Sequence, residues 1–248
     1  MPVYTYAIGA GFFLVIWVAL YALLPGSRKA LLWSGLAWGH AGPINAYWTL
    51  RDYWHPVYLY EFDLGAWRFG VEDYVFAFAF AGLCAAFFEW RVRRQGGAPP
   101  LRFNIYGFAV LLVAGLLSLA LLGLLSMTLE LNSLYANLVP FLGGALGILS
   151  LRPAWWLPAL QAAFLTAGLM WVFYAGFYIP LFPGVIEQWW RADALSGIAV
   201  AGVPIEEVLW AWATGLFGGP ALRFFLVDLP ERWTRKGRDG VSSHKPTT

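Results

Sequence analysis

Charged residues are scarce in this chain. They make up 12% of its 248 residues, about half of the roughly 25% found in an average soluble domain, while hydrophobic residues make up 60%. The only cysteine, Cys84, excludes a disulfide framework and a thiolate metal site. The only lysines lie outside the long apolar runs, at Lys29, Lys236 and Lys245, which excludes a retinal Schiff base inside a membrane bundle.

Sequence motifs for common cofactors are also missing. No Gly-x-Gly-x-x-Gly follows a strand pattern, which excludes a flavin or nicotinamide site of Rossmann type. No aspartate-rich array for magnesium is present, and His40, His55 and His244 are too scattered to indicate a metal site. We therefore expect neither a cofactor nor a metal. The net charge of +2 gives no reason to expect a nucleic-acid partner.

The chain contains seven apolar runs whose lengths are close to the roughly 20 residues that a helix needs to cross a bilayer. They predict an all-α integral membrane protein with seven transmembrane helices. We expect the first run to be retained, because it lacks the basic start and small-residue cleavage site of a signal peptide. The expected spans are residues 3–24, 30–49, 70–90, 103–125, 134–150, 155–175 and 199–222.

Arginine and lysine are distributed unevenly between the two sides of such a bundle. With the N-terminus outside and the C-terminus inside, thirteen basic residues fall in inner segments and three in outer ones. Because cytoplasmic segments are enriched in basic residues, this orientation is the expected one. Residues 227–248 then form a polar cytoplasmic tail. The predicted location is the cytoplasmic membrane of a bacterium or archaeon, in contact with membrane lipids.

Two stretches are similar enough to be copies of one motif. Gly70-Val71-Glu72-Asp73 and Pro204-Ile205-Glu206-Glu207 each place two adjacent carboxylates at the start of a long apolar helix, 134 residues apart. This predicts an internal repeat, which is parallel because an odd number of helices separates the copies. The expected 3+1+3 arrangement has a first three-helix unit in residues 1–91, a connecting helix with loops in 92–133, and a second unit in 134–226.

The four carboxylates of these motifs are candidate catalytic residues. Acidic groups at the edge of a hydrocarbon slab are costly to desolvate, and a membrane protein that repeats them has a use for them. Adjacent helix positions are about 100° apart, so the two members of a pair cannot point the same way. Two stripes follow from helical spacing: Asp73, Phe76 and Phe80 on one helix, and Glu207, Trp210, Thr214 and Phe217 on the other.

A carboxyl group beside aromatic rings suits carbocation chemistry. A neutral acid can protonate a carbon–carbon double bond, aromatic faces can stabilise the cation, and a carboxylate can accept a proton back. One carboxyl group must then be protonated near neutrality, which desolvation and a like charge favour and the helix dipole opposes. Alternatively, the pairs only stabilise the first turn of their helices. The sequence leaves both interpretations open.

Other polar and aromatic positions are candidates for substrate binding. The second run carries His40 and has Pro43 as an expected kink, and polar groups at such depth usually face a cavity. Two aromatic loops precede the motifs, at residues 51–63 and 178–191. They form either an interfacial aromatic belt or a pair of lids over a lipid-soluble substrate. The candidate substrate-binding residues are Asn45, Trp48, Phe76, Tyr174 and Trp210.

At its acidic motifs the chain resembles the integral-membrane carotenoid cyclases, the lycopene cyclase domain family with heterodimeric bacterial and fused archaeal and fungal forms. That family has repeated Pro-x-Glu-Glu/Asp segments that open aromatic-rich helices. The segment 204–207 matches this pattern, and 70–73 matches it with Gly in place of Pro. The resemblance covers about residues 1–225. The chain departs from it in having Trp for Phe after Glu207, and in the block 51–56, which has no counterpart.

The resemblance implies an intramolecular lyase, or isomerase, that cyclises the linear end of lycopene to a β-ionone-type ring without net redox change or cofactor. Glu206 and Glu207 would be the leading proton donor and acceptor, with Glu72 and Asp73 as counterparts. Two other functions stay open: a non-catalytic carotenoid- or lipid-binding protein, and a small transporter that uses the repeated carboxylates. The 19% of aromatic residues favours a hydrophobic polyene or isoprenoid partner. The sequence does not decide whether the protein is a homo-oligomer.

Overall fold

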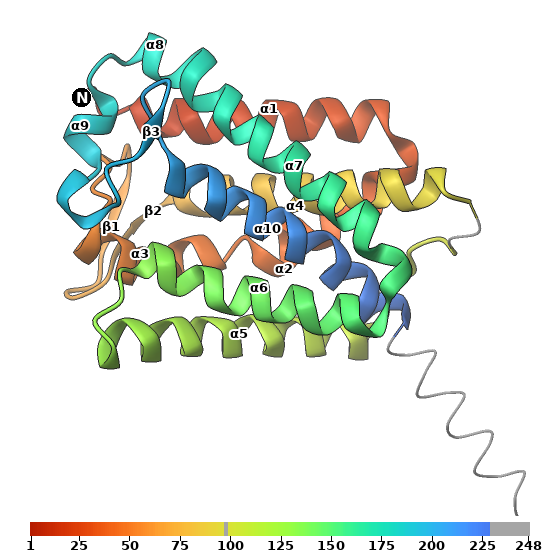
Figure 1. The fold of residues 1–248 in the computed structure, drawn as a ribbon. Helices are drawn as coiled ribbons and strands as arrows, with labels where there is room; N and C mark the ends of the chain where they lie inside the picture. Colours follow the sequence, from red (N-terminus) through yellow and green to blue (C-terminus); the bar gives the residue numbers. More distant parts are fainter. Residues whose placement is uncertain (97–98, 229–248) are drawn as a thin grey trace, which may run out of the picture.

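The long helices of the protein run side by side in a bundle (Figure 1). The computed structural model describes residues 1–96 and 99–228, so the predicted tail from 229 onward lies outside the described residues. The α-helices are α1 (Thr5–Leu23), α2 (Arg28–Trp38), α3 (Ala41–Asp52), α4 (Val71–Arg94), α5 (Ile105–Thr128), α6 (Ser133–Leu151), α7 (Trp156–Val172), α8 (Ile179–Leu181), α9 (Val185–Trp189) and α10 (Ile205–Arg223). A π-helical segment, η3 (Phe173–Tyr178), joins α7 to α8.

Two short antiparallel strand pairs precede the acidic motifs and correct the all-α prediction. They are β1 (Glu61–Asp63) with β2 (Arg68–Gly70), and β3 (Ala199–Val200) with β4 (Val203–Pro204). The expected span 199–222 is therefore wrong in its first six residues, since α10 begins at Ile205. Between β3 and β4, Ala201 and Gly202 both have positive φ angles, of 54° and 78°. Such a two-residue turn matches the twist of an antiparallel pair and excludes a helix.

The expected second span is broken into two helices. α2 ends at Trp38 and α3 begins at Ala41, with a turn at Gly39 and His40 between them. Pro43 lies in the first turn of α3, where a missing backbone N–H costs little because these groups have no intrahelical acceptor. The break falls at Gly39 and His40, next to the i−4 carbonyl that a proline at position 43 crowds, so the helix is interrupted where Pro43 predicts.

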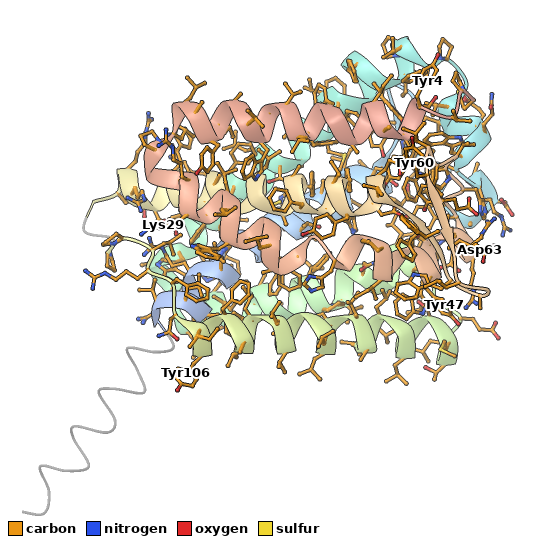
Figure 2. All side chains as sticks on the ribbon, turned by 180° about the vertical axis from the view of Figure 1, so that it is seen from behind. Tyr4, Lys29, Tyr47, Tyr60, Asp63 and Tyr106 are labelled. Atoms are coloured by element: carbon orange, nitrogen blue, oxygen red, sulfur yellow. The ribbon has the colours of Figure 1, made fainter. Side chains whose placement is uncertain are left out.

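Five helical segments are long and apolar enough to cross a membrane: Thr5–Leu23, Val71–Arg94, Ile105–Thr128, Ser133–Leu151 and Pro153–Leu181. Large apolar side chains on their outward faces are exposed, among them Val15, Leu117, Met127, Leu157 and Phe164. A surface of this kind is unfavourable in water and suits a lipid environment. The protein is an integral membrane protein. Figure 2 shows side chains projecting all along the outward faces of α1 and α5.

The ends of the bundle differ in character. The strands, α8 and α9 gather with Met1 at one end, hereafter the loop end, where α4 and α10 begin (Figure 1). Figure 2 shows Tyr4, Tyr60 and Asp63 at this end and Lys29 at the opposite one. The basic last turns of α4 and α10 also lie opposite the loop end.

Helices α4 and α10 pack against each other and run in the same direction from the loop end (Figure 1). Near their start the rings of Phe76 and Trp210 stack, with centroids 6.2 Å apart. Further along, Gly218 faces the side chain of Cys84. Each of these contacts joins residues 134 positions apart, the spacing of the acidic motifs. Matching positions of the two motif helices therefore face each other.

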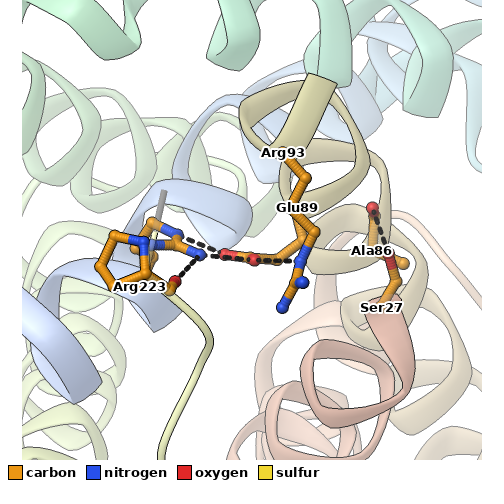
Figure 3. A network of polar contacts seen from close by, with 6 residues as sticks. Ser27, Ala86, Glu89, Arg93 and Arg223 are labelled. Carbon is orange, nitrogen blue, oxygen red and sulfur yellow. Dashed lines mark hydrogen bonds and ion pairs between the residues drawn. The ribbon is translucent and has the colours of Figure 1, made fainter. Parts of the chain in front are cut away.

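A third contact with this spacing is the buried ion pair of Glu89 and Arg223, 134 residues apart (Figure 3). Arg223 Nε lies 2.6 Å from Glu89 Oε1 and Nη2 lies 2.8 Å from Oε2, and the side chains are 2% and 1% exposed. Arg223 also donates to the carbonyl of Pro99 at 3.0 Å, and Arg93 Nε lies 3.5 Å from Glu89. The bidentate geometry offsets the cost of burying both charges.

Helix α3 lies directly against the start of α4. A Cβ atom at Gly42 would come within 2.2 Å of the carbonyl oxygen of Asp73, so only glycine allows this approach. This contact brings the face of α3 that carries Asn45 toward the second carboxylate of the first motif.

Candidate functional site

A partly open cavity of about 180 Å³ lies between the helices. Both predicted stripes line it, since Asp73, Phe76 and Phe80 reach it from α4 and Glu207, Trp210, Thr214 and Phe217 from α10. Other walls come from α1, α2, α3, α5, α6, η3 and α9. Most of these side chains are apolar or aromatic, so the cavity suits a hydrophobic ligand with a few polar contacts.

Asp73 is buried and makes two hydrogen bonds. Its Oδ1 accepts from the hydroxyl of Tyr6 on α1 at 2.9 Å. Its Oδ2 accepts from the backbone N–H of Gly70 at 2.9 Å, which satisfies a free donor at the start of α4. One oxygen therefore caps the helix, while the other faces a tyrosine that lines the same cavity.

Glu207 has comparable surroundings in the other half of the chain. Its Oε1 accepts from the indole N–H of Trp190 at 2.8 Å, and its Oε2 accepts from the hydroxyl of Tyr174 on η3 at 3.3 Å. Within residues 1–96 and 99–228, neither Glu207 nor Asp73 has an ion-pair partner. Each of these carboxylates is thus held by neutral donors inside an aromatic cavity.

The first carboxylate of each motif points elsewhere. Glu72 Oε1 accepts from the backbone N–H of Leu59 at 2.6 Å. Glu206 Oε1 accepts from the backbone N–H of Ser196 at 2.7 Å and from the hydroxyl of Tyr135 at 2.9 Å. Neither Glu72 nor Glu206 lines the cavity. The angle of about 100° between adjacent helix positions accounts for this division.

The two aromatic loops join over the loop end of the cavity. Trp54 and Trp190 form an antiparallel β-bridge. On either side of it, His55 N donates to Trp189 O at 2.7 Å and Arg191 N donates to Tyr53 O at 2.8 Å. Tyr53 and the three tryptophans also line the cavity. These contacts favour the lid interpretation, and the segments 53–60 and 189–198 together are called the cap below.

Two tyrosines of the cap lie close to the cavity carboxylates. Burial, followed by the charges of Glu207 and Asp52, raises the pKa of Tyr53 well above its usual value. Burial, followed by the charge of Asp73, likewise raises the pKa of Tyr58. Both hydroxyl groups therefore stay protonated at neutral pH and can only donate or accept as neutral groups.

Residues 132–225 match the family model described as lycopene cyclase. This part of the chain is a lycopene cyclase family domain. It contains α6, α7, η3 and α10, and hence Tyr174, Glu206, Glu207 and Trp210, whereas Asp73 and Phe76 precede it. No curated protein and no solved structure matches the chain.

The cavity combines residues of the lycopene cyclase domain with residues that precede it. Of the predicted substrate-binding residues, Tyr174 and Trp210 line the cavity from within the domain, and Asn45 and Phe76 from outside it. Asn45 Oδ1 accepts from Asn137 Nδ2 of the domain at 3.4 Å. Trp48 does not line the cavity. Instead, its ring covers Gly123 on α5.

Sequence reasoning missed Tyr6, the hydroxyl donor to Asp73. Tyr6 lies 67 residues before Asp73, and no local pattern links the two. Tyr174, by contrast, was predicted, and the π-helical turn of η3 aims it. This wider turn also directs Tyr178 toward α1, where its hydroxyl donates to the carbonyl of Thr5 at 3.1 Å. π-helical turns within helices are frequent at functional sites.

Proposed function

We propose that the protein is a carotenoid cyclase, which closes a ring at the end of a linear polyene inside this cavity. One observation carries the proposal: Asp73 and Glu207, at matching positions of the two motif helices, line one aromatic cavity. The lycopene cyclase domain at residues 132–225 supports the choice of substrate class. The reaction is an isomerisation, so it needs no redox partner.

The two cavity carboxyl groups divide the proton transfers between them. One of them, in its neutral form, protonates the terminal carbon–carbon double bond of the polyene. The resulting cation is attacked by a second double bond of the same chain, which forms the ring bond. Ring closure moves the positive charge to the other carbon of the attacking double bond. The second group, as a carboxylate, then removes a proton from a carbon adjacent to this cationic carbon, and a new double bond forms. One proton enters and one leaves, so the product has the mass of the substrate.

Aromatic rings next to the carboxylates stabilise the cation between these steps. The rings of Phe80 and Trp210 stack with centroids 5.2 Å apart, and those of Phe76 and Phe80 stack at 5.4 Å. Aromatic faces attract cations, most strongly where water is excluded. The cap limits the entry of water from the loop end, which protects the cation from capture.

We further propose that residues 1–91 and 134–226 are parallel copies of one three-helix unit, joined by residues 92–133. The three contacts between residues 134 positions apart, at Phe76, Cys84 and Glu89, support this. In parallel copies related by a two-fold axis, residues on the axis meet their own counterparts. Each half then supplies one carboxylate to the site.

The proposed membrane arrangement has seven spans, with the loop end outside and the C-terminus inside. It adds the broken pair α2–α3 and the motif helix α10 to the five apolar segments. The clustering of arginines at the ends of α4 and α10 opposite the loop end supports this orientation, because basic residues favour the cytoplasmic side. The substrate then enters from the membrane into a site near its outer face.

Solvent isotope labelling tests the proposed reaction. Membranes that contain the protein are incubated with lycopene in D₂O, and the products are separated and weighed by mass spectrometry. The proposal predicts a cyclic isomer that is one mass unit heavier for each ring closed, since each closure takes a solvent-exchanged proton and releases a carbon-bound one. Lycopene that co-purifies with the protein but stays unlabelled and unchanged would overturn the proposal in favour of a binding protein.

A further inference from the structure

The first carboxylates of the two motifs have equivalent environments. Glu72 is 5% exposed and Glu206 is 1% exposed, and both lie outside the cavity. Each accepts a short hydrogen bond from a backbone N–H of the cap, at Leu59 and at Ser196. In each, Oε2 is buried and has no hydrogen-bond partner within the part of the chain that the structure describes. The bond to the cap is thus the feature that the two residues share.

On the first side, the cap segment supports the donor of Asp73. Leu59 follows Tyr58, whose ring packs against that of Tyr6 with centroids 5.8 Å apart. Trp54 of the same segment meets the Tyr6 ring edge-on at 4.9 Å. Tyr6 in turn donates its hydroxyl to Asp73. Fixing Leu59 therefore restrains the aromatic group that orients this hydroxyl.

On the second side, the support is more direct. Ser196 belongs to the cap segment that begins with Trp189 and Trp190, and the indole N–H of Trp190 donates to Glu207. Glu206 also accepts from Tyr135 on α6, so it ties the segment both to α10 and to α6. The bridge between Trp54 and Trp190 links the two cap segments.

We propose that Glu72 and Glu206 are positioning residues that fasten the cap over the cavity and do not transfer protons to the substrate. By accepting one backbone N–H each, they hold the segments that orient Tyr6 toward Asp73 and Trp190 toward Glu207. This inference rests on the proposed cyclase function. It divides each acidic pair into a fastening residue and a catalytic residue.

An acidic residue in the first turn of a helix can also act through its charge on the helix dipole. Substitution by glutamine separates this charge effect from the acceptance of the cap N–H. Glutamine keeps an oxygen that can accept the cap N–H but loses the negative charge, whereas methionine has a similar length and loses both. A proton-transfer role would be abolished by either substitution. The comparison of Gln and Met at the same position therefore isolates the acceptor function.

The test compares Glu206→Gln, Glu206→Met and Glu207→Gln, and the same series at 72 and 73 with Asp73→Asn. The readouts are the rate of lycopene cyclisation and the hydrogen–deuterium exchange of the cap peptides. We expect the Gln variants at 72 and 206 to stay within about threefold of the wild-type rate. The Met variants should lose about 10- to 100-fold in rate, because the cap is no longer held and the donors to Asp73 or Glu207 lose their orientation. Amide exchange at Leu59 should be faster only in Glu72→Met, and amide exchange at Ser196 only in Glu206→Met.

Two outcomes would overturn the inference. A Glu206→Gln variant as inactive as Glu207→Gln, with unchanged exchange in the cap, would make Glu206 a proton-transfer residue. Unchanged exchange in a folded Met variant would show that the cap does not depend on the glutamate. If the Met variant fails to fold, the cyclisation rate of the Gln variant alone decides whether the glutamate transfers a proton. A wild-type protein that leaves lycopene unchanged would refute the cyclase function instead, while the exchange readout would still test the fastening.

Discussion

At the scale of single residues, the members of each acidic pair have separate surroundings. The sequence predicts this much, because adjacent helix positions diverge by about 100° and the aromatic stripes start at Asp73 and Glu207. It does not predict what the other members, Glu72 and Glu206, contact. Their partners are backbone N–H groups of Leu59 and Ser196, and backbone donors have no sequence signature.

The cavity pair is expected to be essential for cyclisation. Asp73→Asn and Glu207→Gln keep the size of the side chain and lose the ability to transfer a proton. We expect each to lower the turnover rate of lycopene by at least about 100-fold, the usual contribution of a general acid or base. The matched control is Glu61→Gln, since Glu61 is an exposed carboxylate on β1 whose partner is Arg68 at 3.4 Å. Rates that are equal in all three variants would contradict the assignment.

At the scale of elements, the lengths of the apolar runs predict where helices occur, but they do not predict where each helix begins and ends. All seven predicted runs contain helix, yet residues 199–204 form a strand pair, β3 and β4, because Ala201 and Gly202 adopt positive φ angles in the turn between them. The cap is the element that the sequence could least predict. The sequence predicts two aromatic loops here, but it does not predict their pairing, because the bridge from Trp54 to Trp190 joins positions far apart in the chain.

The close approach of α3 to α4 should be sensitive to one methyl group. At Gly42 an added Cβ would meet the backbone of Asp73, which must shift and carry the carboxylate with it. We expect Gly42→Ala to cost about 1–3 kcal/mol of stability, as overpacked sites do, and to lower cyclisation as well. Gly147→Ala on α6 is the control, because a Cβ there meets nothing within 4 Å. Thermal unfolding in detergent measures both variants. Equal unfolding temperatures in the two variants would contradict the prediction, because they would show that α3 and α4 can move apart without loss of stability.

At the scale of the whole molecule, α4 and α10 form the centre of the bundle through contacts between residues 134 positions apart. The repeated motif predicts this spacing, but it does not predict which residues meet at the ends of α4 and α10 opposite the loop end. Glu89 and Arg223 occupy matching positions with opposite charges, so a comparison of the two motifs alone would not have paired them. Of these two central helices, α10 lies within the range that matches the lycopene cyclase model and α4 precedes it, since the range begins at residue 132.

The buried ion pair predicts a non-additive effect on stability. Among the described residues, Glu89→Met leaves the buried Arg223 with the carbonyl of Pro99 as its hydrogen-bond partner, so we expect a loss of about 3–5 kcal/mol. Removing both charges in Glu89→Met with Arg223→Met should restore most of this loss, because no uncompensated charge remains. Chemical or thermal unfolding of the single and double variants gives the coupling energy. A double variant less stable than Glu89→Met would show that the pair is not coupled in this way.

The proposed function of this protein is cyclisation of a linear polyene by Asp73 and Glu207. The most direct measurement is mass spectrometry and absorption spectroscopy of pigments extracted from a lycopene-accumulating host, with the wild-type protein, with the Asp73→Asn and Glu207→Gln variants, and with no added protein. We expect an isomer of equal mass that absorbs at shorter wavelength, formed by the wild-type protein and by neither variant. Unaltered lycopene, with the wild-type protein verified in the membrane, would contradict the proposed function.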